Sequence, residues 1–170
     1  MSTVTERADT LEKSLSEVHG TLQLVSFHLA NELYGIEITK VREIILISEI
    51  TRIPQTPHYV KGLINLRSTV IPVIDLRTLF GIAEGQQTDE SRIMVLQAGR
   101  KTVGIMVDAV SEVLRVKNDQ IAPPPPTVTS LGNEYLNGLV KLDKKLLILL
   151  DIDKILGREE ETLTAAMAGV

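Results

Sequence analysis

Two segments of the chain are near-copies of each other. Residues 59–81 read YVKGLINLRSTVIPVIDLRTLFG, and residues 135–157 read YLNGLVKLDKKLLILLDIDKILG. They align without a gap at an offset of 76 positions (135 − 59). Each copy is typical of two apolar strands around a short turn, followed by an Asp that caps a helical turn and a Gly that ends it. The repeat therefore predicts a protein that is built twice from one module.

A second block repeats at a shorter offset. Gly35 and its neighbours align with Gly104 and its neighbours at an offset of 69 positions (104 − 35). The second copy therefore carries seven extra residues (76 − 69) between its two blocks. They fall within residues 115–134, where Pro123–Pro126 predict a surface loop in the polyproline II conformation.

Two modules of about five short strands each predict an all-β fold with short helices. We expect two tandem five-stranded β-barrels, because closure into a barrel leaves no exposed sheet edge. One copy alone is too small for an ample core, so we expect the barrels to pack about a common hydrophobic seam. The polar stretch 84–92 is the predicted boundary between the halves.

The segment 22–29 predicts a strand whose inward-facing side changes. Leu22 and Leu24 share one face, whereas Val25, Phe27 and Leu29 share the opposite face. A β-bulge would cause this change, and so would a strand that leaves one core and enters another. Both explanations are open, and the duplication favours the second.

Residues 39–47 present an unusual concentration of apolar side chains. Thr39 is a suitable N-cap and Val41, Ile44 and Ile45 follow at helical spacing, which predicts a short helix. Asp108 occupies the matching cap position in the second copy. The run 44–47 has more apolar residues than one half-buried turn can cover. The surplus either packs in the seam or forms a patch for another protein, and both readings stay open.

Composition and motifs favour a protein without enzymatic chemistry. The net charge is −4, which argues against nucleic-acid binding, and there are no cysteines. The three histidines lack metal-ligand spacing, and no phosphate-binding glycine motif is present. Asp75 and Asp151 occupy matching positions before helical turns, so they are predicted to be N-caps. We expect no catalytic residues, no metal and no cofactor. The N-terminus lacks a signal-peptide pattern and no apolar run is long enough for a membrane helix, so we expect a cytoplasmic protein.

Five segments resemble the CheW family of chemotaxis coupling proteins. The resemblance extends over residues 22–156, in order and nearly without gaps. The segments are YGIEITKVREI (34–44), ITRIPQTPHYVKGLINLR (50–67), VIPVIDLRTLF (70–80), VGIMVDAVSEVL (103–114) and EYLNGLVKLDKKLLILLDIDKIL (134–156).

The resemblance implies a non-enzymatic adaptor with two SH3-like barrels. Such a protein couples methyl-accepting chemoreceptors to the histidine kinase CheA, through the kinase's regulatory domain. It is cytoplasmic and is recruited to membrane-bound receptor arrays without inserting into the membrane. Whether the output is flagellar or another process, such as pilus control, stays open. From another class, the alternative is a generic SH3-like peptide-binding module, which the scarcity of aromatic residues disfavours.

We expect a single CheW-like domain over residues 21–157, flanked by a flexible tail at 1–20 and another at 158–170. Within it, the first barrel spans roughly residues 25–84 and the second roughly 92–145, with exchange of the first and last strands left open.

The resemblance also implies the contact residues. The receptor-binding residues are Val41, Glu43 and Arg67, and the kinase-binding residues are Lys61 and Gly62. The usual family text around the arginine is NLRG, whereas this chain reads NLRS. Ser68 in place of Gly predicts another turn type at this position.

Overall fold

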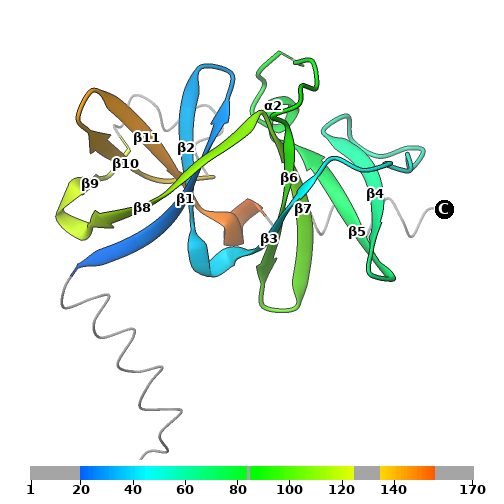
Figure 1. Ribbon diagram of the computed structural model, residues 1–170, viewed down its shortest axis with the longest axis horizontal. Helices are drawn as coiled ribbons and strands as arrows, with labels where there is room; N and C mark the ends of the chain where they lie inside the picture. The colour runs from blue at the N-terminus through cyan, green and yellow to red at the C-terminus, as the bar shows by residue number, and fades with distance from the viewer. Residues whose placement is uncertain (1–19, 84, 125–134, 156–170) are drawn as a thin grey trace, which may run out of the picture.

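The computed structural model describes residues 20–83, 85–124 and 135–155. The predicted tails and most of the predicted proline-rich loop lie outside these ranges. The described residues form two curved, mostly antiparallel sheets that lie side by side (Figure 1). None of the described helices is long and apolar enough to cross a membrane. An all-β fold made of two barrel-like units with short helices is therefore confirmed.

Sheet A, on the left of Figure 1, has the strand order β8-β1-β2-β11-β10-β9. Its strands are β1 (Thr21–Leu29), β2 (Glu32–Glu37), β8 (Ala109–Lys117), β9 (Ile121–Ala122), β10 (Leu136–Leu142) and β11 (Lys145–Leu150). Sheet B has the order β3-β6-β7-β5-β4. Its strands are β3 (Val41–Leu46), β4 (Val60–Leu66), β5 (Thr69–Asp75), β6 (Arg92–Ala98) and β7 (Lys101–Val107). The helical turns are η1 (Ile38–Lys40), α2 (Leu76–Leu79), η2 (Asn118–Gln120) and 152–155.

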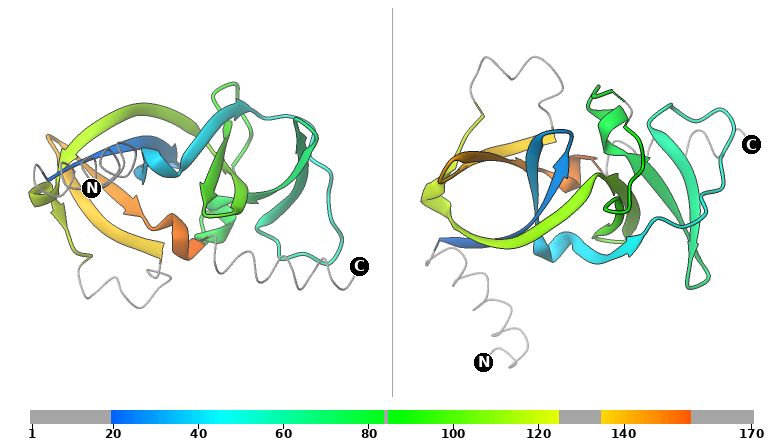
Figure 2. Two further views of the ribbon diagram at one scale, coloured as in Figure 1. Left: turned by 90° about the horizontal axis from the view of Figure 1, so that it is seen from below. Right: turned by 45° about the horizontal axis from the view of Figure 1, so that its top comes forward.

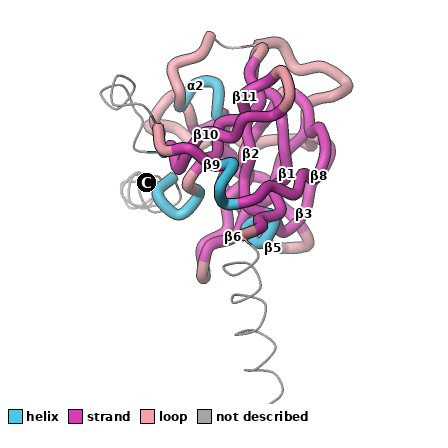
Figure 3. The backbone as a smooth tube through the Cα atoms, turned by 90° about the vertical axis from the view of Figure 1, so that its left-hand side faces the viewer, coloured by secondary structure: helices cyan, strands magenta, loops and turns pink. Residues whose placement is uncertain are grey.

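The sheets do not follow the two halves of the chain. Sheet A joins β1 and β2 of the first copy to β8–β11 of the second, and sheet B joins β6 and β7 of the second copy to β3–β5 of the first. Figures 2 and 3 show the early β1–β2 hairpin beside the late strands β10 and β11. The two sheets therefore do not have the predicted barrel boundaries, 25–84 and 92–145, because each copy contributes its first hairpin to the other copy's sheet.

Equivalent parallel ladders join the copies. β2 runs parallel to β11, with Gly35 opposite Leu149, and β7 runs parallel to β5, with Gly104 opposite Val73. The offsets of the repeat relate these two pairings to each other. A Cβ atom on Gly35 would lie 2.7 Å from a methyl carbon of Leu147, and one on Gly104 would lie 2.8 Å from a methyl carbon of Ile93. A larger residue at either place would therefore force the facing side chain to shift, because that side chain packs against the glycine backbone.

Three apolar cores stabilise this arrangement. Sheet A has its own core, which includes Leu24 and Leu147, and sheet B has its own core, which includes Ile64 and Val95. The largest cluster lies between the sheets and takes side chains from both. Its members include Phe27, Ile36, Ile74, Leu96, Ile105 and Leu150. The predicted seam is therefore confirmed.

The change of face along 22–29 has the second of the two causes considered above, a strand that serves two cores, because the β-bulge beside it places its extra residue on β8 and not on β1. Leu24 belongs to the core of sheet A, whereas Val25 and Phe27 belong to the seam. The register of β1 against β8 also shifts between Val25 and Phe27. At this bulge the Ser26 hydroxyl donates to the Glu112 carbonyl at 2.6 Å and accepts from the Glu112 N–H at 3.0 Å. The hydroxyl thus pairs two backbone groups that the bulge removes from the ladder.

The helix predicted over residues 39–45 is wrong. The 3-10 turn ends at Lys40, no side chain caps it, and β3 follows. Exposure alternates along β3, so that Ile45 and Ile47 pack on the core of sheet B while Ile44 faces out. A run of apolar residues fits a strand as well as a helix, and pairing with β6 decides for the strand. Asp108 likewise caps no helix, because β8 begins at the next residue.

An ion pair joins the two sheets at Asp108. Arg77 in α2 donates to this carboxylate from Nε at 2.8 Å and from Nη2 at 2.6 Å. The N–H of Ala30, in the β1–β2 turn of sheet A, donates to it at 2.7 Å. The repeat places Asp153 where the first copy has Arg77, and Asp153 pairs with Lys40 at 3.2 Å. In this second pair the acidic residue occupies the position that the basic residue has in the first pair, and both of its side chains are more exposed.

The β4–β5 turn has an uncommon backbone. Arg67 has a φ of +51° and Ser68 a φ of +67°, as in a type I′ hairpin turn. The prediction that Ser68 selects another turn type is wrong, because this serine adopts the left-handed conformation that glycine prefers. Asp143 and Lys144 of the matching β10–β11 turn are not among the described residues with positive φ.

Replacing Ser68 by Gly should stabilise the protein. The change removes the steric penalty of a Cβ atom in the left-handed region, and after the entropy cost of glycine we expect a gain of about 0.5–1 kcal/mol in the free energy of unfolding. Lys144→Gly is the matched control, and it should lower this free energy instead. Urea unfolding measures both changes, and equal effects would contradict the difference between the turns.

Replacing Asp108 by Asn should weaken the joint between the sheets. Burial by itself raises the pKa of the Asp108 carboxyl, but hydrogen bonds from Arg77 and the Ala30 N–H, with the charge of Arg77, hold that pKa below its ordinary value. The stabilisation is complete above the unfolded-state pKa of about 3.9 and is lost as the pH falls through the folded-state pKa. Asp108→Asn should lower the free energy of unfolding by about 1–3 kcal/mol at neutral pH. It should also make this free energy fall less steeply as the pH is lowered into the acid range.

The control for this prediction is Asp153→Asn, which breaks the equivalent, more exposed pair. It should cost no more than about 1 kcal/mol in the free energy of unfolding. Urea titrations between pH 3 and pH 7 compare the variants. Equal costs for the two substitutions, or an unchanged acid limb in Asp108→Asn, would contradict the assignment.

Candidate functional site

Arg67 and Glu43 bridge the two edges of sheet B. β3 and β4 are the edge strands of this sheet, and no ladder joins them. The backbone of Thr51, in the connection between them, pairs with Leu63 at one point. Farther along, Nη2 of Arg67 lies 2.8 Å from a carboxylate oxygen of Glu43. Two of the residues predicted to contact a receptor are thus brought together where the sheet is open.

The ion pair leaves bonding capacity unused. The Arg67 side chain is 76% exposed, so most of its donors face solvent. The second oxygen of Glu43, Oε1, is buried and has no hydrogen-bond partner among the described residues. A buried oxygen without a donor costs about 1–3 kcal/mol, and such groups in native proteins call for an explanation. Together with the left-handed backbone at Arg67 and Ser68, this marks the site as one that is not optimised for stability alone.

Val41 connects this ion pair to the seam. It is partly buried and packs against the cluster between the sheets. Beside Arg42, the outward face of β3 carries two exposed apolar side chains, with Ile44 40% exposed and Leu46 68% exposed. None of the apolar residues 44–47 packs in the seam, so the reading that places the surplus there is wrong, and the patch for another protein stays a prediction. Ile45 and Ile47 serve the core of sheet B, whereas Ile44 and Leu46 form an exposed apolar face.

Lys61 and Gly62, the predicted kinase contacts, lie on β4, the edge strand that leads to Arg67. The Lys61 ammonium is 3.7 Å from the buried carboxylate of Asp75. That carboxylate also accepts from the backbone N–H of Arg77 at 3.2 Å and from the hydroxyl of Thr78 at 2.9 Å. Asp75 is therefore the N-cap of α2, as predicted, and Asp151 likewise accepts from the Lys154 N–H.

Gly62 has a structural role of its own. It lies at a bulge of β4 against β5 with a φ of +143°, and a Cβ atom there would lie 2.1 Å from the Thr51 carbonyl oxygen. Any side chain would push the β3–β4 connection away from the sheet. A substitution of Gly62 therefore tests folding before it tests binding.

One feature of the site escaped sequence reasoning, and a second, the exposed face of β3, was one of two readings left open. The unpaired oxygen of Glu43 depends on packing between distant strands, which no local pattern shows. The exposed face of β3 did leave a signal, because Arg42, Ile44 and Leu46 alternate with inward-facing residues. No cluster of His, Cys, Asp and Glu suited to a metal ion occurs among the described residues.

Known proteins resemble this chain in sequence and in structure. The family model of the CheW-like domain matches residues 23–160. The chain is 44% identical over 160 residues to the chemotaxis protein CheW of Klebsiella aerogenes, across 94% of this chain and 95% of that protein. It is 37% identical over 142 residues to the chemotaxis protein CheW of Treponema pallidum, across 81% and 84% of the two chains.

A solved structure supports the same conclusion. The crystal structure of the scaffolding protein TtCheW from Thermoanaerobacter tengcongensis superposes with a TM-score of 0.72 at 40% identity, and covers 77% of this chain and 84% of its own. The chain that has the repeat, the two sheets and the seam is thus matched over most of its length, both in sequence and in structure. This chain belongs to the CheW-like family.

Proposed function

We propose that this protein is a chemotaxis adaptor, which couples the cytoplasmic tips of methyl-accepting chemoreceptors to the regulatory domain of the histidine kinase CheA. Membership of the CheW-like family supports this role, as do relatives named as chemotaxis proteins and a structural neighbour described as a scaffold. The proposed role is non-enzymatic and is exerted in the cytoplasm at receptor arrays. It requires only surfaces that bind other proteins.

The observation that carries the proposal is the Arg67–Glu43 pair. It combines an exposed guanidinium with a buried carboxylate oxygen for which the described part of the chain supplies no donor. A partner that donates to Glu43 and accepts from Arg67 would satisfy both groups. Val41 beside them and the exposed Ile44 and Leu46 supply apolar area to the same edge of sheet B. We assign this surface to the receptor tip, and we assign Lys61 to the kinase.

The positions of the aromatic side chains disfavour the peptide-binding alternative. The chain has three Tyr, two Phe and no Trp. Phe27, Tyr34, Phe80 and Tyr135 lie in one row of neighbouring rings, with centroids about 6 Å apart, in or against the seam. Tyr59 packs partly buried against the same cluster. Grooves that bind proline-rich peptides need exposed rings, and these five are committed to the core.

A pull-down tests the proposal. The tagged chain is incubated with a CheA regulatory domain and, separately, with a receptor cytoplasmic tip. We expect it to retain both. Retention of neither would contradict the adaptor role.

Arg67→Ala should weaken receptor binding and leave stability almost unchanged. An arginine in a protein interface typically contributes 1–2 kcal/mol, so we expect roughly a five- to thirtyfold weaker Kd for the receptor tip. The exposed ion pair itself is worth at most about 1 kcal/mol of unfolding free energy. Calorimetry and thermal unfolding measure the two effects.

The matched control is Arg100→Ala, an exposed arginine in the β6–β7 turn of the same sheet. It should leave receptor binding unchanged. If Arg67→Ala lowered stability by much more than about 1 kcal/mol, Arg67 would be a structural residue and not a contact.

A further inference from the structure

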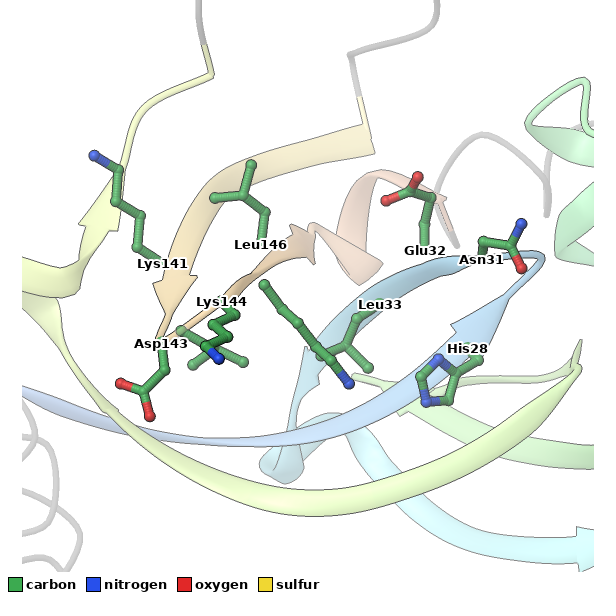
Figure 4. Close-up of a pocket in the computed structure, with 10 residues that line it drawn as sticks. His28, Asn31, Glu32, Leu33, Lys141, Asp143, Lys144 and Leu146 are labelled. Carbon is green, nitrogen blue, oxygen red and sulfur yellow. The ribbon is translucent and has the colours of Figure 1, made fainter.

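A pocket of about 650 Å³ opens on sheet A, away from the Arg67–Glu43 pair. Two hairpins form its walls (Figure 4). The β1–β2 hairpin provides His28, Asn31, Glu32 and Leu33, and the β10–β11 hairpin provides residues 141–146. Its size is within the range of sites that bury a ligand or several side chains of a partner.

The pocket exists because two paired strands diverge. The parallel ladder between β2 and β11 joins only three residues of each strand, and it starts at Leu33 and Leu147. Before that point β2 turns back to β1, and β11 turns back to β10. The ladder therefore does not reach Glu32 and Leu146, and the two hairpins separate. An extended segment of another chain can lie along a gap of this kind.

Lysines supply most of the charge that lines the pocket. Lys144 and Lys145 are exposed, and their ammonium groups pair with no described residue. Three lysines line the pocket against two carboxylates, Glu32 and Asp143, in a chain whose net charge is −4. The local excess of positive charge favours an acidic partner.

The pocket also has an apolar component. Leu146 is 51% exposed and lies on the wall opposite Leu33 (Figure 4). An exposed leucine among unpaired lysines is not explained by the packing of sheet A. A partner with both carboxylates and aliphatic side chains would match this combination.

The repeat places this pocket at the counterpart of the receptor surface. Residues 143–145 (Asp-Lys-Lys) occupy the turn position that residues 67–69 (Arg-Ser-Thr) occupy in sheet B. One turn carries an arginine paired with Glu43, and the other carries lysines that have no ion-pair partner in the described ranges. The same place in the fold thus has different chemistry in the two sheets.

We propose that this pocket is a second docking site, which binds an extended acidic segment of a partner protein with aliphatic side chains between its carboxylates. Lys144 and Lys145 bind the carboxylates, and the exposed Leu146 contacts the aliphatic groups, beside the largely buried Leu33. The site does not depend on the Arg67–Glu43 surface, so it can be occupied whether or not that surface binds a receptor.

An NMR titration of the full chain tests the proposal. The probe is the blocked hexapeptide Glu-Leu-Glu-Leu-Glu-Leu. We expect saturable shifts at the amides of Leu33, Lys144 and Leu146. In Lys144→Gln/Lys145→Gln the Kd should weaken about threefold or more, since each exposed charge contact is worth up to about 1 kcal/mol.

The control variant is Arg100→Gln/Lys154→Gln, which removes the same charge from exposed positions outside the pocket. It should change the Kd by less than about twofold. Equal weakening by both variants would show general electrostatic attraction and overturn the proposal, as would shifts confined to other residues.

Three further probes separate the alternatives. Hexa-glutamate and inorganic phosphate should bind more weakly than the mixed peptide, and Lys-Leu-Lys-Leu-Lys-Leu should not bind. Equal binding of phosphate would show a small-anion site and overturn the peptide proposal. Shifts that appear at these residues on raising the concentration of the chain alone would identify a second copy as the occupant, with the same consequence.

Discussion

The two parallel ladders, β2 with β11 and β5 with β7, are the constraint on which the rest of the structure depends. A parallel pair requires a long connection, and here each ladder joins strands from different copies of the repeat. Each sheet is completed by a hairpin of the other copy, so neither sheet can form from one half of the chain. The seam then buries side chains from the facing sides of both sheets in one cluster. Duplication and exchange together solve the problem that a single copy has too small a core.

This arrangement also positions the candidate site. Sheet B remains open between β3 and β4, and the Arg67–Glu43 pair lies at that opening. β3 enters sheet B directly from η1, beside the seam, which holds Val41. A buried seam therefore supports an edge at which one carboxylate oxygen, Oε1 of Glu43, has no hydrogen-bond partner among the described residues. The residues common to both copies maintain the scaffold, as Gly62, Asp75 and their counterparts show, while the turns differ in sequence.

Sequence reasoning predicted the scaffold better than its connections. The repeat, the N-cap roles of Asp75 and Asp151, the seam, and the change of face after Leu24 follow from local patterns and are confirmed. The strand β3 was mistaken for a helix because four consecutive apolar residues satisfy both periods, and only pairing with β6 decides between them. The exchange of hairpins is a long-range choice between equivalent partners, which composition and spacing cannot distinguish.

The central claim is that the exchanged hairpins make the two sheets one cooperative unit. Hydrogen exchange in increasing denaturant, followed by mass spectrometry of peptides from each sheet, tests it most directly. Core amides of β1 and β2 in sheet A and of β6 and β7 in sheet B should exchange with the same free energy of opening, within about 1 kcal/mol, because neither sheet can open without losing a hairpin of the other copy. Persistent protection of one sheet while the other exchanges at a clearly lower free energy would contradict the account.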